Sequence, residues 1–344
     1  MLFADDMVIL GDTLVDLQNS LDLLSTYCNK WGLEVNTLKT KIMFFRKRGP
    51  VKSNEKWHYN NQELDIVDNF NYLGIVFNYT GTFVLNQETL GDKGLKALNV
   101  LMNNIKGLSL KPSVKCQLFD AFVGSTLNYG CAIWGFGKSK EIERIHLMFC
   151  KSLLNVKTSS SNIGVYGKLG RYPLYINRYL QIIKYWGKIV SSSNILLVKL
   201  YEYFLVSKNN RNNWAYQVKC LLDNFGFSYV WNNPTLVDLD KFHLAFKERV
   251  LDTFKQNWCQ RMNDCGTLDM YKNFKTSFLF EKYLDLLPFK YRSALARLRL
   301  SSHKLAIETG HYSRNRTDRN LRYCIFCQQR YRRRIPFYNS VPIV

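Results

Sequence analysis

Hydrophobic positions form short runs at the start of the chain. Two apolar runs, residues 2–4 and 7–10, flank the adjacent carboxylates Asp5 and Asp6. Short apolar runs joined by a two-residue acidic turn are typical of a buried β-hairpin, which would place both acids at its tip. A helical stretch is expected next, over residues 13–31.

Beyond residue 80 the hydrophobic spacing becomes that of α-helices. Apolar residues recur three and four positions apart over residues 90–108, 113–127 and 140–154, with Gly or Pro between these segments. We therefore predict an α+β fold that is mostly helical. The sequence has no run of eighteen apolar residues and lacks the features of a signal peptide. These absences predict an intracellular protein, nuclear or cytoplasmic, with no membrane partner.

The charge balance favours nucleic acid as a partner. The chain of 344 residues has 48 Lys and Arg against 27 Asp and Glu, a formal net charge of +21. A cationic excess of this size suits binding to a phosphate backbone, which releases counterions and needs no base recognition. The aromatic content of 15% also provides rings on which bases can stack.

Asp5 and Asp6 are candidate metal ligands. Nucleotidyl transfer uses hard oxygen ligands to hold two Mg²⁺ ions, one lowering the pKa of an attacking hydroxyl and one holding the triphosphate. Paired aspartates on a rigid hairpin supply such oxygens. The alternative is a polar turn, because Asp is a common turn residue.

Three segments carry a family resemblance. The acidic hairpin is followed in order by residues 32–36 (GLEVN), residues 39–45 (KTKIMFF) and residues 71–75 (NYLGI). Together they resemble motifs C, D and E of reverse transcriptases, specifically those of non-LTR (LINE-like) retrotransposons. The resemblance implies an RNA-directed DNA polymerase that binds Mg²⁺, an RNA template and a DNA primer or target.

The resemblance also assigns roles to individual residues. It implies that Asp5 and Asp6 are the catalytic, metal-binding acids of the "ADD" box. Asn36 and Lys39 match the centre of motif D, where Lys39 would protonate the leaving pyrophosphate, with Lys41 as the substitute. Tyr72, Leu73 and Gly74 match the primer-grip turn. The alternatives are solvated lysines and plain strand packing.

The same resemblance predicts the domain order and one departure. Residues 1–80 would form the C-terminal part of the palm, residues 81–230 the helical thumb and connection, and residues 231–344 a helical C-terminal region. The family carries a third palm carboxylate and the fingers upstream of the ADD box, but four residues precede Asp5 here. We therefore expect a C-terminal portion of a larger polyprotein, inactive alone. The alternatives are a non-catalytic nucleic-acid-binding remnant and a decayed reading frame.

Two arginine-rich segments are candidates for nucleic-acid contacts. Residues 291–303 predict an amphipathic helix with a basic face formed by Arg292, Arg297 and Arg299, and a solvated face is its alternative. A later, helix-poor cluster is the better candidate for RNA or DNA backbone contacts. It consists of Arg314, Arg316, Arg319 and Arg322.

The cysteines predict an incomplete zinc element and no disulfide framework. Nine cysteines are scattered along the chain, and only Cys324 and Cys327 form a Cys-x-x-Cys pair. One such pair is half of a zinc site, and His303 and His311 lie upstream of it at unusual distances. LINE-like proteins commonly end in a Cys-Cys-His-Cys element, so the resemblance implies zinc in the intact parent protein.

Overall fold

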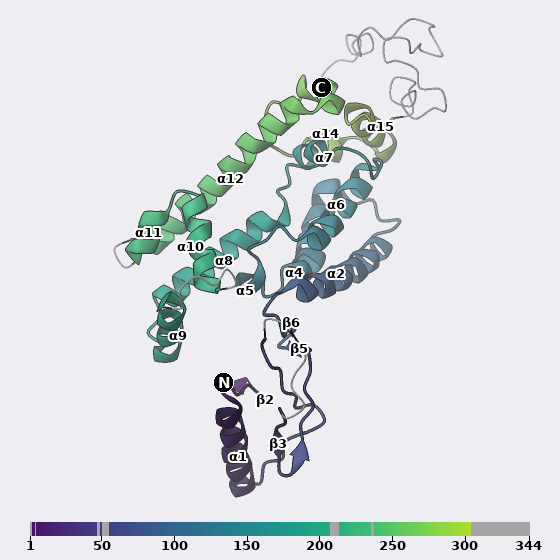
Figure 1. Ribbon diagram of the computed structural model, residues 1–344. Coiled ribbons are helices and arrows are strands. Elements are labelled where there is room, and N and C mark those ends of the chain that lie inside the picture. The colour runs from purple at the N-terminus through teal and green to yellow at the C-terminus, as the bar shows by residue number, and fades with distance from the viewer. Residues whose placement is uncertain are drawn as a thin grey trace, which may run out of the picture. The chain divides into compact units, whose positions relative to one another are not determined.

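The computed structural model describes residues 2–3, 5–46, 49, 55–206, 213–234 and 237–303. The predicted sites at Arg314, Arg316, Arg319, Arg322, Cys324 and Cys327 lie outside these residues. The chain divides into two compact units, Met1–Thr89 and Leu90–Val344. Figure 1 shows that helices predominate and that strands are few and short, as the sequence predicts.

In the first unit, helix α1 (Leu14–Trp31) begins and ends at residues suited to those positions. The Thr13 hydroxyl accepts a hydrogen bond from the backbone N–H of Asp16 at 3.1 Å, and Gly32 closes the helix in the left-handed conformation, with φ 62°. One face of α1 is buried through Leu21 and Cys28. Leu21 packs in a small cluster with Ile42, Trp57, Tyr59 and Leu64.

Three antiparallel strand pairs complete this unit. They are β1 (Leu2–Phe3) with β2 (Asp6–Met7), β3 (His58–Tyr59) with β4 (Gln62–Glu63), and β5 (Asn69–Tyr72) with β6 (Ile75–Asn78). Residues 39–45 contribute only an isolated bridge, between Ile42 and Ile66. Each pair stands as its own two-stranded sheet, so this unit has little sheet surface on which to build a core.

The β5–β6 turn holds a leucine in a strained conformation. Leu73 and Gly74 have φ values of 48° and 81°, as a two-residue type I′ turn requires. Asn-Gly suits such a turn, whereas a leucine in the left-handed region costs roughly 1 kcal/mol. The hairpin is held from outside, because the Asn86 amide oxygen accepts the backbone N–H of Val76 at 3.0 Å.

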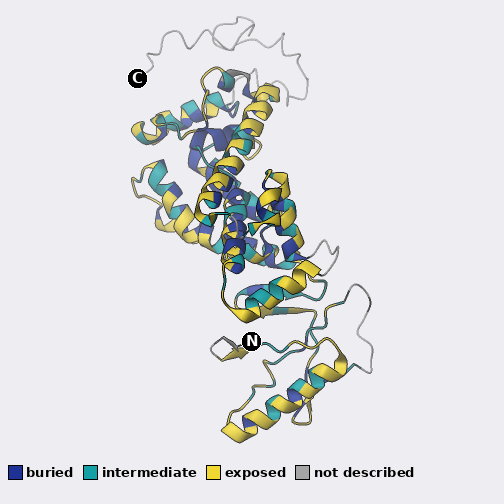
Figure 2. Ribbon diagram, turned by 90° about the vertical axis from the view of Figure 1, so that its left-hand side faces the viewer, coloured by how far each residue is buried: buried dark blue, intermediate teal, exposed yellow. Residues whose placement is uncertain are grey.

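Helix α2 (Val84–Asn104) spans the boundary between the units, and the remaining elements belong to the second unit. These are α3 (Pro112–Leu118), the π-helix η1 (Phe119–Gly124), α4 (Ser125–Leu127), α5 (Cys131–Trp134), α6 (Lys140–Leu154), α7 (Asn162–Leu169), α8 (Leu174–Val190), α9 (Ile195–Val206), α10 (Trp214–Asn224), α11 (Ser228–Asn232), α12 (Leu239–Asp264), η3 (Gly266–Leu268), α13 (Asp269–Lys272), α14 (Tyr283–Leu286) and α15 (Phe289–Arg299). Figure 2 shows buried residues concentrated here and a largely exposed α1.

Aromatic packing joins α8, α10, α11 and α12. Trp186 of α8 is fully buried, stacks on Trp231 with ring centroids 5.9 Å apart, and meets Phe242 of α12 edge-on. The buried residues of this hydrophobic cluster run from Ile176 to Val250.

No single helix among the described residues has the length and hydropathy to cross a membrane. Helices α8 and α9 meet that test only as a pair, and they are bent by 113° relative to each other. The described cysteines are all free thiols. Four of them, Cys28, Cys116, Cys131 and Cys150, are buried, as expected of small hydrophobic residues.

One buried carboxylate binds several cations in the second unit. Glu281 accepts hydrogen bonds from Lys168 at 2.9 Å, Tyr271 at 2.8 Å and Arg299 at 3.2 Å. Lys275 lies 3.7 Å from the same carboxylate. Burial raises the pKa of Glu281, but attraction and hydrogen bonding by Lys168 outweigh it and lower the pKa below 4.5. This carboxylate thus balances charges contributed by α7, α15 and the segment between them.

The three arginines of the predicted basic face of residues 291–303 do not form an open surface, because each binds a group within the protein. Arg292 donates to the Leu284 carbonyl at 3.3 Å, Arg297 to the Asn155 carbonyl at 2.6 Å, and Arg299 to Glu281. All three guanidinium groups therefore hold α15 to neighbouring segments. Sequence periodicity finds the helix but not these partners, because they are supplied by residues distant in sequence.

Glu281→Gln should lower the free energy of unfolding by about 3 kcal/mol at pH 7, because buried cations lose their counter-charge. The lowered pKa means that this stability is present above pH 4.5 and is lost as the pH falls through the folded-state pKa. Urea unfolding followed by circular dichroism, from pH 7 to pH 3, measures both effects. Asp252→Asn, which breaks the exposed pair with Lys255, is the control and should cost under about 1 kcal/mol. Equal losses in the two variants would contradict the role given to Glu281.

Leu73→Asn should stabilise the β5–β6 hairpin, because asparagine tolerates the left-handed conformation that strains leucine. Relief of roughly 1 kcal/mol corresponds to about fivefold slower amide exchange in peptides covering β5 and β6, measured by hydrogen-exchange mass spectrometry. Leu38→Asn, at an exposed position without positive φ, is the control. No gain at Leu73, or an equal gain at Leu38, would show that the turn is not strained.

Candidate functional site

The predicted hairpin forms at the start of the chain. Phe3 pairs with Asp6 and Leu2 with Met7, and Asp5 lies in the connecting turn. Both acids are exposed, and Met7 is 41% exposed, so the described part of this hairpin is not buried as predicted. The reason is physical: two strands of two residues each cannot cover one another.

Asp5 and Asp6 supply oxygen ligands of the type that Mg²⁺ prefers. A two-metal site needs further carboxylates to hold both ions. No group of three His, Cys, Asp or Glu side chains able to hold a metal occurs among the described residues. The described residues therefore do not by themselves fit the two-metal site of a polymerase.

The structure distinguishes the two candidate lysines. Lys39 lies in a turn where its backbone N–H donates to the Asn36 side-chain oxygen and carbonyl oxygen, each at 3.1 Å. Its side chain is exposed and makes no ion pair with the described residues. Lys41 is paired with Asp65 at 2.5 Å. Lys39 is therefore the lysine with an available amine.

The predicted primer-grip residues form the β5–β6 turn. Tyr72 pairs with Ile75, and Leu73 and Gly74 form the tip, where the Leu73 side chain is 37% exposed. The base of the hairpin is braced by Arg46, which binds Asp68 at 2.6 Å and lies 4.2 Å from the Tyr79 ring centroid. A strained residue that exposes an apolar side chain at a turn is a functional signal.

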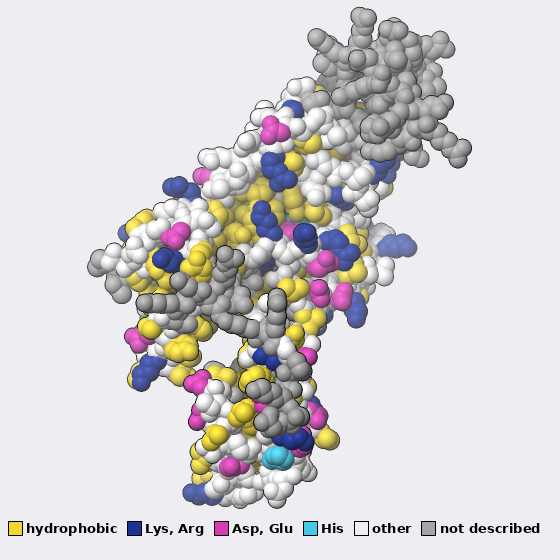
Figure 3. Space-filling view, viewed as in Figure 1, with side chains coloured by type: hydrophobic (Ala, Val, Ile, Leu, Met, Phe, Trp, Pro, Cys, Tyr) yellow, Lys and Arg dark blue, Asp and Glu magenta, His cyan; other side chains and the backbone are white. Residues whose placement is uncertain are grey.

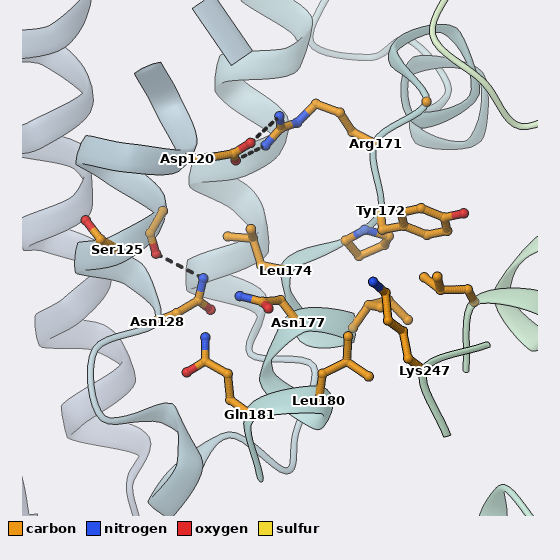
Figure 4. Close-up of a pocket in the computed structure, with 15 residues that line it drawn as sticks. Asp120, Ser125, Asn128, Arg171, Tyr172, Leu174, Asn177, Leu180, Gln181 and Lys247 are labelled. Carbon is orange, nitrogen blue, oxygen red and sulfur yellow. Dashed lines mark hydrogen bonds and ion pairs between the residues drawn. The ribbon is translucent and has the colours of Figure 1, made fainter. Parts of the chain in front are cut away.

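A cleft of about 710 Å³ in the second unit was not predicted from the sequence. Residues of η1, α4, α8 and α12, with the connection at residues 170–173, line it (Figure 4). Asn177 and Gln181 lie one turn apart on α8, and Lys247 faces them from α12. Figure 3 shows hydrophobic surface beside α12 bordered by Lys and Arg side chains.

An ion pair fixes one edge of the cleft. Arg171 binds both carboxylate oxygens of Asp120, and its Nε–H donates to His146 Nε2 at 3.0 Å. Because Nε2 accepts this bond, the His146 ring is neutral, and burial lowers its pKa. The Arg171 guanidinium also lies 5.4 Å from the Phe119 ring centroid. Its position is therefore set by the protein, and its charge is matched by Asp120.

The spacing of polar residues on α8 is the signal that could have revealed this cleft. Asn177 and Gln181 are exposed amides four residues apart on a helix whose other residues include buried Ile176 and Ile182. The same pattern describes any solvated helix face. Only the packing of α4 and α12 around α8 turns it into a lined cavity.

The start of the chain matches a known protein family. Residues 1–77 match the family described as reverse transcriptase (RNA-dependent DNA polymerase). An uncharacterised transposon-derived protein of Caenorhabditis elegans is 30% identical over 145 residues, which cover 42% of this chain and 51% of that protein. No solved structure matches the chain significantly.

A second relative is the retrovirus-related Pol polyprotein from the type-1 retrotransposable element R2 of Nasonia vitripennis. It is 26% identical over 131 residues, which cover 36% of this chain and 12% of the polyprotein. The chain thus spans about half of the worm protein and about an eighth of the polyprotein. These matches confirm the resemblance drawn from the acidic hairpin and its downstream motifs: part of the chain is similar to the reverse transcriptases of non-LTR retrotransposons.

Proposed function

We propose that this chain contributes to RNA-directed DNA synthesis, with Asp5 and Asp6 as ligands for catalytic Mg²⁺. The family match over residues 1–77 carries this proposal, because it covers the acidic hairpin and the downstream motifs together. The exposed position of both carboxylates supports it, since neither is committed to an ion pair within the described residues.

The remaining predicted residues have distinct parts in this proposal. In a completed palm, Asp5 and Asp6 would contribute oxygen ligands to Mg²⁺, whose chemistry there would be activation of the primer 3′-hydroxyl and neutralisation of the triphosphate. Lys39, with its unpaired amine, donates a proton to the leaving pyrophosphate, whereas Asp65 holds Lys41. Tyr72, Leu73 and Gly74 position the primer end through the rigid β5–β6 turn. The proposed partners are an RNA template and a DNA primer or target.

We propose further that the 344 residues alone do not polymerise. Two carboxylates hold two metal ions poorly, and the described residues provide no third acid beside them. Activity would then require a third palm carboxylate and a nucleotide-binding fingers region supplied by additional protein.

Primer extension tests the catalytic proposal. The 344-residue chain should not extend a DNA primer on an RNA template with Mg²⁺ or Mn²⁺. Fusion to the fingers and upstream palm of a related R2-type reverse transcriptase should produce extension that Asp5→Asn and Asp6→Asn each abolish. Lys39→Met should slow nucleotide addition by about 100-fold, the low end for loss of a general acid, while Lys41→Met serves as its control.

Extension by the 344-residue chain alone, lost on Asp5→Asn, would overturn the proposed need for a third acid. Extension by the fusion protein that survives both aspartate substitutions would instead overturn the assignment of Asp5 and Asp6.

The non-catalytic alternative is nucleic-acid binding by charge, and the net charge of +21 favours it. Binding of single strands should weaken with salt, with log K falling by about 0.7 per log unit of salt for each phosphate contacted. Fluorescence anisotropy between 50 and 300 mM salt, roughly the range over which such contacts are lost, measures this slope.

Replacing Arg314, Arg316, Arg319 and Arg322 together by Ala should flatten the slope. The matched control removes four exposed lysines of the described surface, Lys93, Lys96, Lys188 and Lys241. A slope that changes equally in both variants would contradict a specific role for the arginine cluster.

A further inference from the structure

The cleft in the second unit has one wall of amide side chains. Asn177 and Gln181 project from α8, and Asn128 directly follows α4. Figure 4 shows the three amide groups pointing toward one another on the same side of the cavity. Three amides around one space offer donors and acceptors in a fixed arrangement.

The three amides differ in how many of their donors and acceptors are already hydrogen-bonded within the protein. Asn128 is 8% exposed; its amide donates to the Gly124 carbonyl at 2.9 Å and its oxygen accepts from Arg178 at 3.5 Å. The Gln181 oxygen accepts from the Cys131 thiol at 3.1 Å. The Gln181 NH₂ group and the whole Asn177 amide have no partner among the described residues. Two amide edges therefore remain open to a ligand.

The opposite wall and the floor have different chemistry. Lys247 of α12 is exposed and makes no ion pair with the described residues. Leu174, Leu180 and Leu251 contribute apolar side chains to the lining, and these three are called the leucine floor below. The only carboxylate in the lining, that of Asp120, is neutralised by Arg171. The cleft thus combines an apolar surface, open amide edges and one unmatched positive charge.

We propose that this cleft binds a single nucleotide, with the base on the leucine floor, its edge on Asn177 and Gln181, and its phosphate toward Lys247. This inference rests on the proposed binding of nucleic acid. The volume lies within the range of small-molecule sites, and side-chain amides are complementary to the N6/N7 edge of adenine. A bare phosphate fits less well, because the cleft has one uncommitted cation and the leucine floor.

The nucleotide can come from a strand, as a base that has left the stack, or from the free pool. Single-stranded RNA is commonly read through splayed bases that stack on aromatic or Arg side chains and hydrogen-bond at their edges. Asn177 and Gln181 are exposed, and the one bond to the buried core that their substitution removes is that between Gln181 and the Cys131 thiol.

Fluorescence anisotropy of the full chain with labelled 12-nucleotide RNA, in adenine-rich and fully abasic forms, tests the proposal. The double variant Asn177→Ala/Gln181→Ala should weaken binding of the adenine-rich strand about tenfold, as expected for losing edge hydrogen bonds, and leave the abasic strand unchanged. The matched control is Gln256→Ala/Gln260→Ala, two exposed amides of α12 that do not line the cleft. Lys247→Ala should weaken both strands and reduce the salt slope by about 0.7.

Competition with AMP distinguishes the two sources of the nucleotide. Displacement of the adenine-rich strand by AMP, lost in the double variant, shows a site for free nucleotide as well. If the cleft binds only strands, AMP will not displace the RNA, and the chain will still bind the adenine-rich strand more tightly than the abasic strand.

The cleft proposal is overturned if the chain binds RNA but the double variant binds the adenine-rich strand as tightly as its control variant does. It is also overturned if the double variant and its control lose affinity for the abasic strand to the same extent. Failure of the wild-type chain to bind any strand would instead overturn the nucleic-acid binding on which the inference rests. A second variant, Gln181→Glu, keeps side-chain volume and should weaken binding of the adenine-rich strand because a carboxylate has no N–H to donate to the base edge, so a loss cannot be attributed to packing alone.

Discussion

The second unit depends on Glu143, which joins α6 to the start of α8. Its carboxylate accepts the backbone N–H groups of Leu174 at 3.1 Å and Tyr175 at 2.8 Å, and it also accepts from Arg178 at 3.3 Å. Free N–H groups and a favourable dipole at a helix start make a carboxylate stabilising there. Because Arg178 is fully buried, this contact fixes the direction of α8 as well as its first turn.

That direction sets both faces of α8. One face carries Ile182 and Trp186 into the aromatic cluster with α10 and α12. The other carries Asn177 and Gln181 into the cleft. Arg178 extends the restraint by donating to the Lys138 carbonyl at 3.0 Å, so the segment before α6 is tied to the same point. The cleft is therefore a product of how α8 is anchored.

No carboxylate among the described residues of the first unit anchors a helix start and a buried arginine together. Helix α1 of this unit buries Leu21 and Cys28, yet Leu23, Tyr27 and Trp31 form an exposed apolar stripe on another face, four residues apart. A helix with two apolar faces has more hydrophobic surface than its unit covers. The proposal that polymerisation needs additional protein accounts for this surface, because a completed palm would have apolar area to place against it.

The sequence predicts local structure well, since local structure depends on neighbours. Thr13 and Gly32 delimit α1, and the spacing over residues 140–154 matches α6. The partners of Arg292, Arg297 and Arg299 were not predictable, because the carbonyls and the carboxylate that bind them come from distant segments. The roles of Asp5, Asp6 and Lys39 stay predictions that rest on motif resemblance, and the hairpin geometry adds only their exposure.

Several of the positively charged side chains are buried and paired within the protein, so the net charge does not show which cations can bind nucleic acid. Lys168 and Arg178 are fully buried, and Arg171 and Arg299 are mostly buried; all four bind carboxylates within the protein. Burying a cation is costly unless it is paired, so these residues stabilise the fold and cannot also bind phosphate. The carboxylate partners of these cations are already subtracted in the net charge of +21, so the positive excess that can meet nucleic acid is carried by exposed residues such as Lys247. Binding should then depend on where each exposed cation lies, which makes a single well-placed lysine more informative than the total.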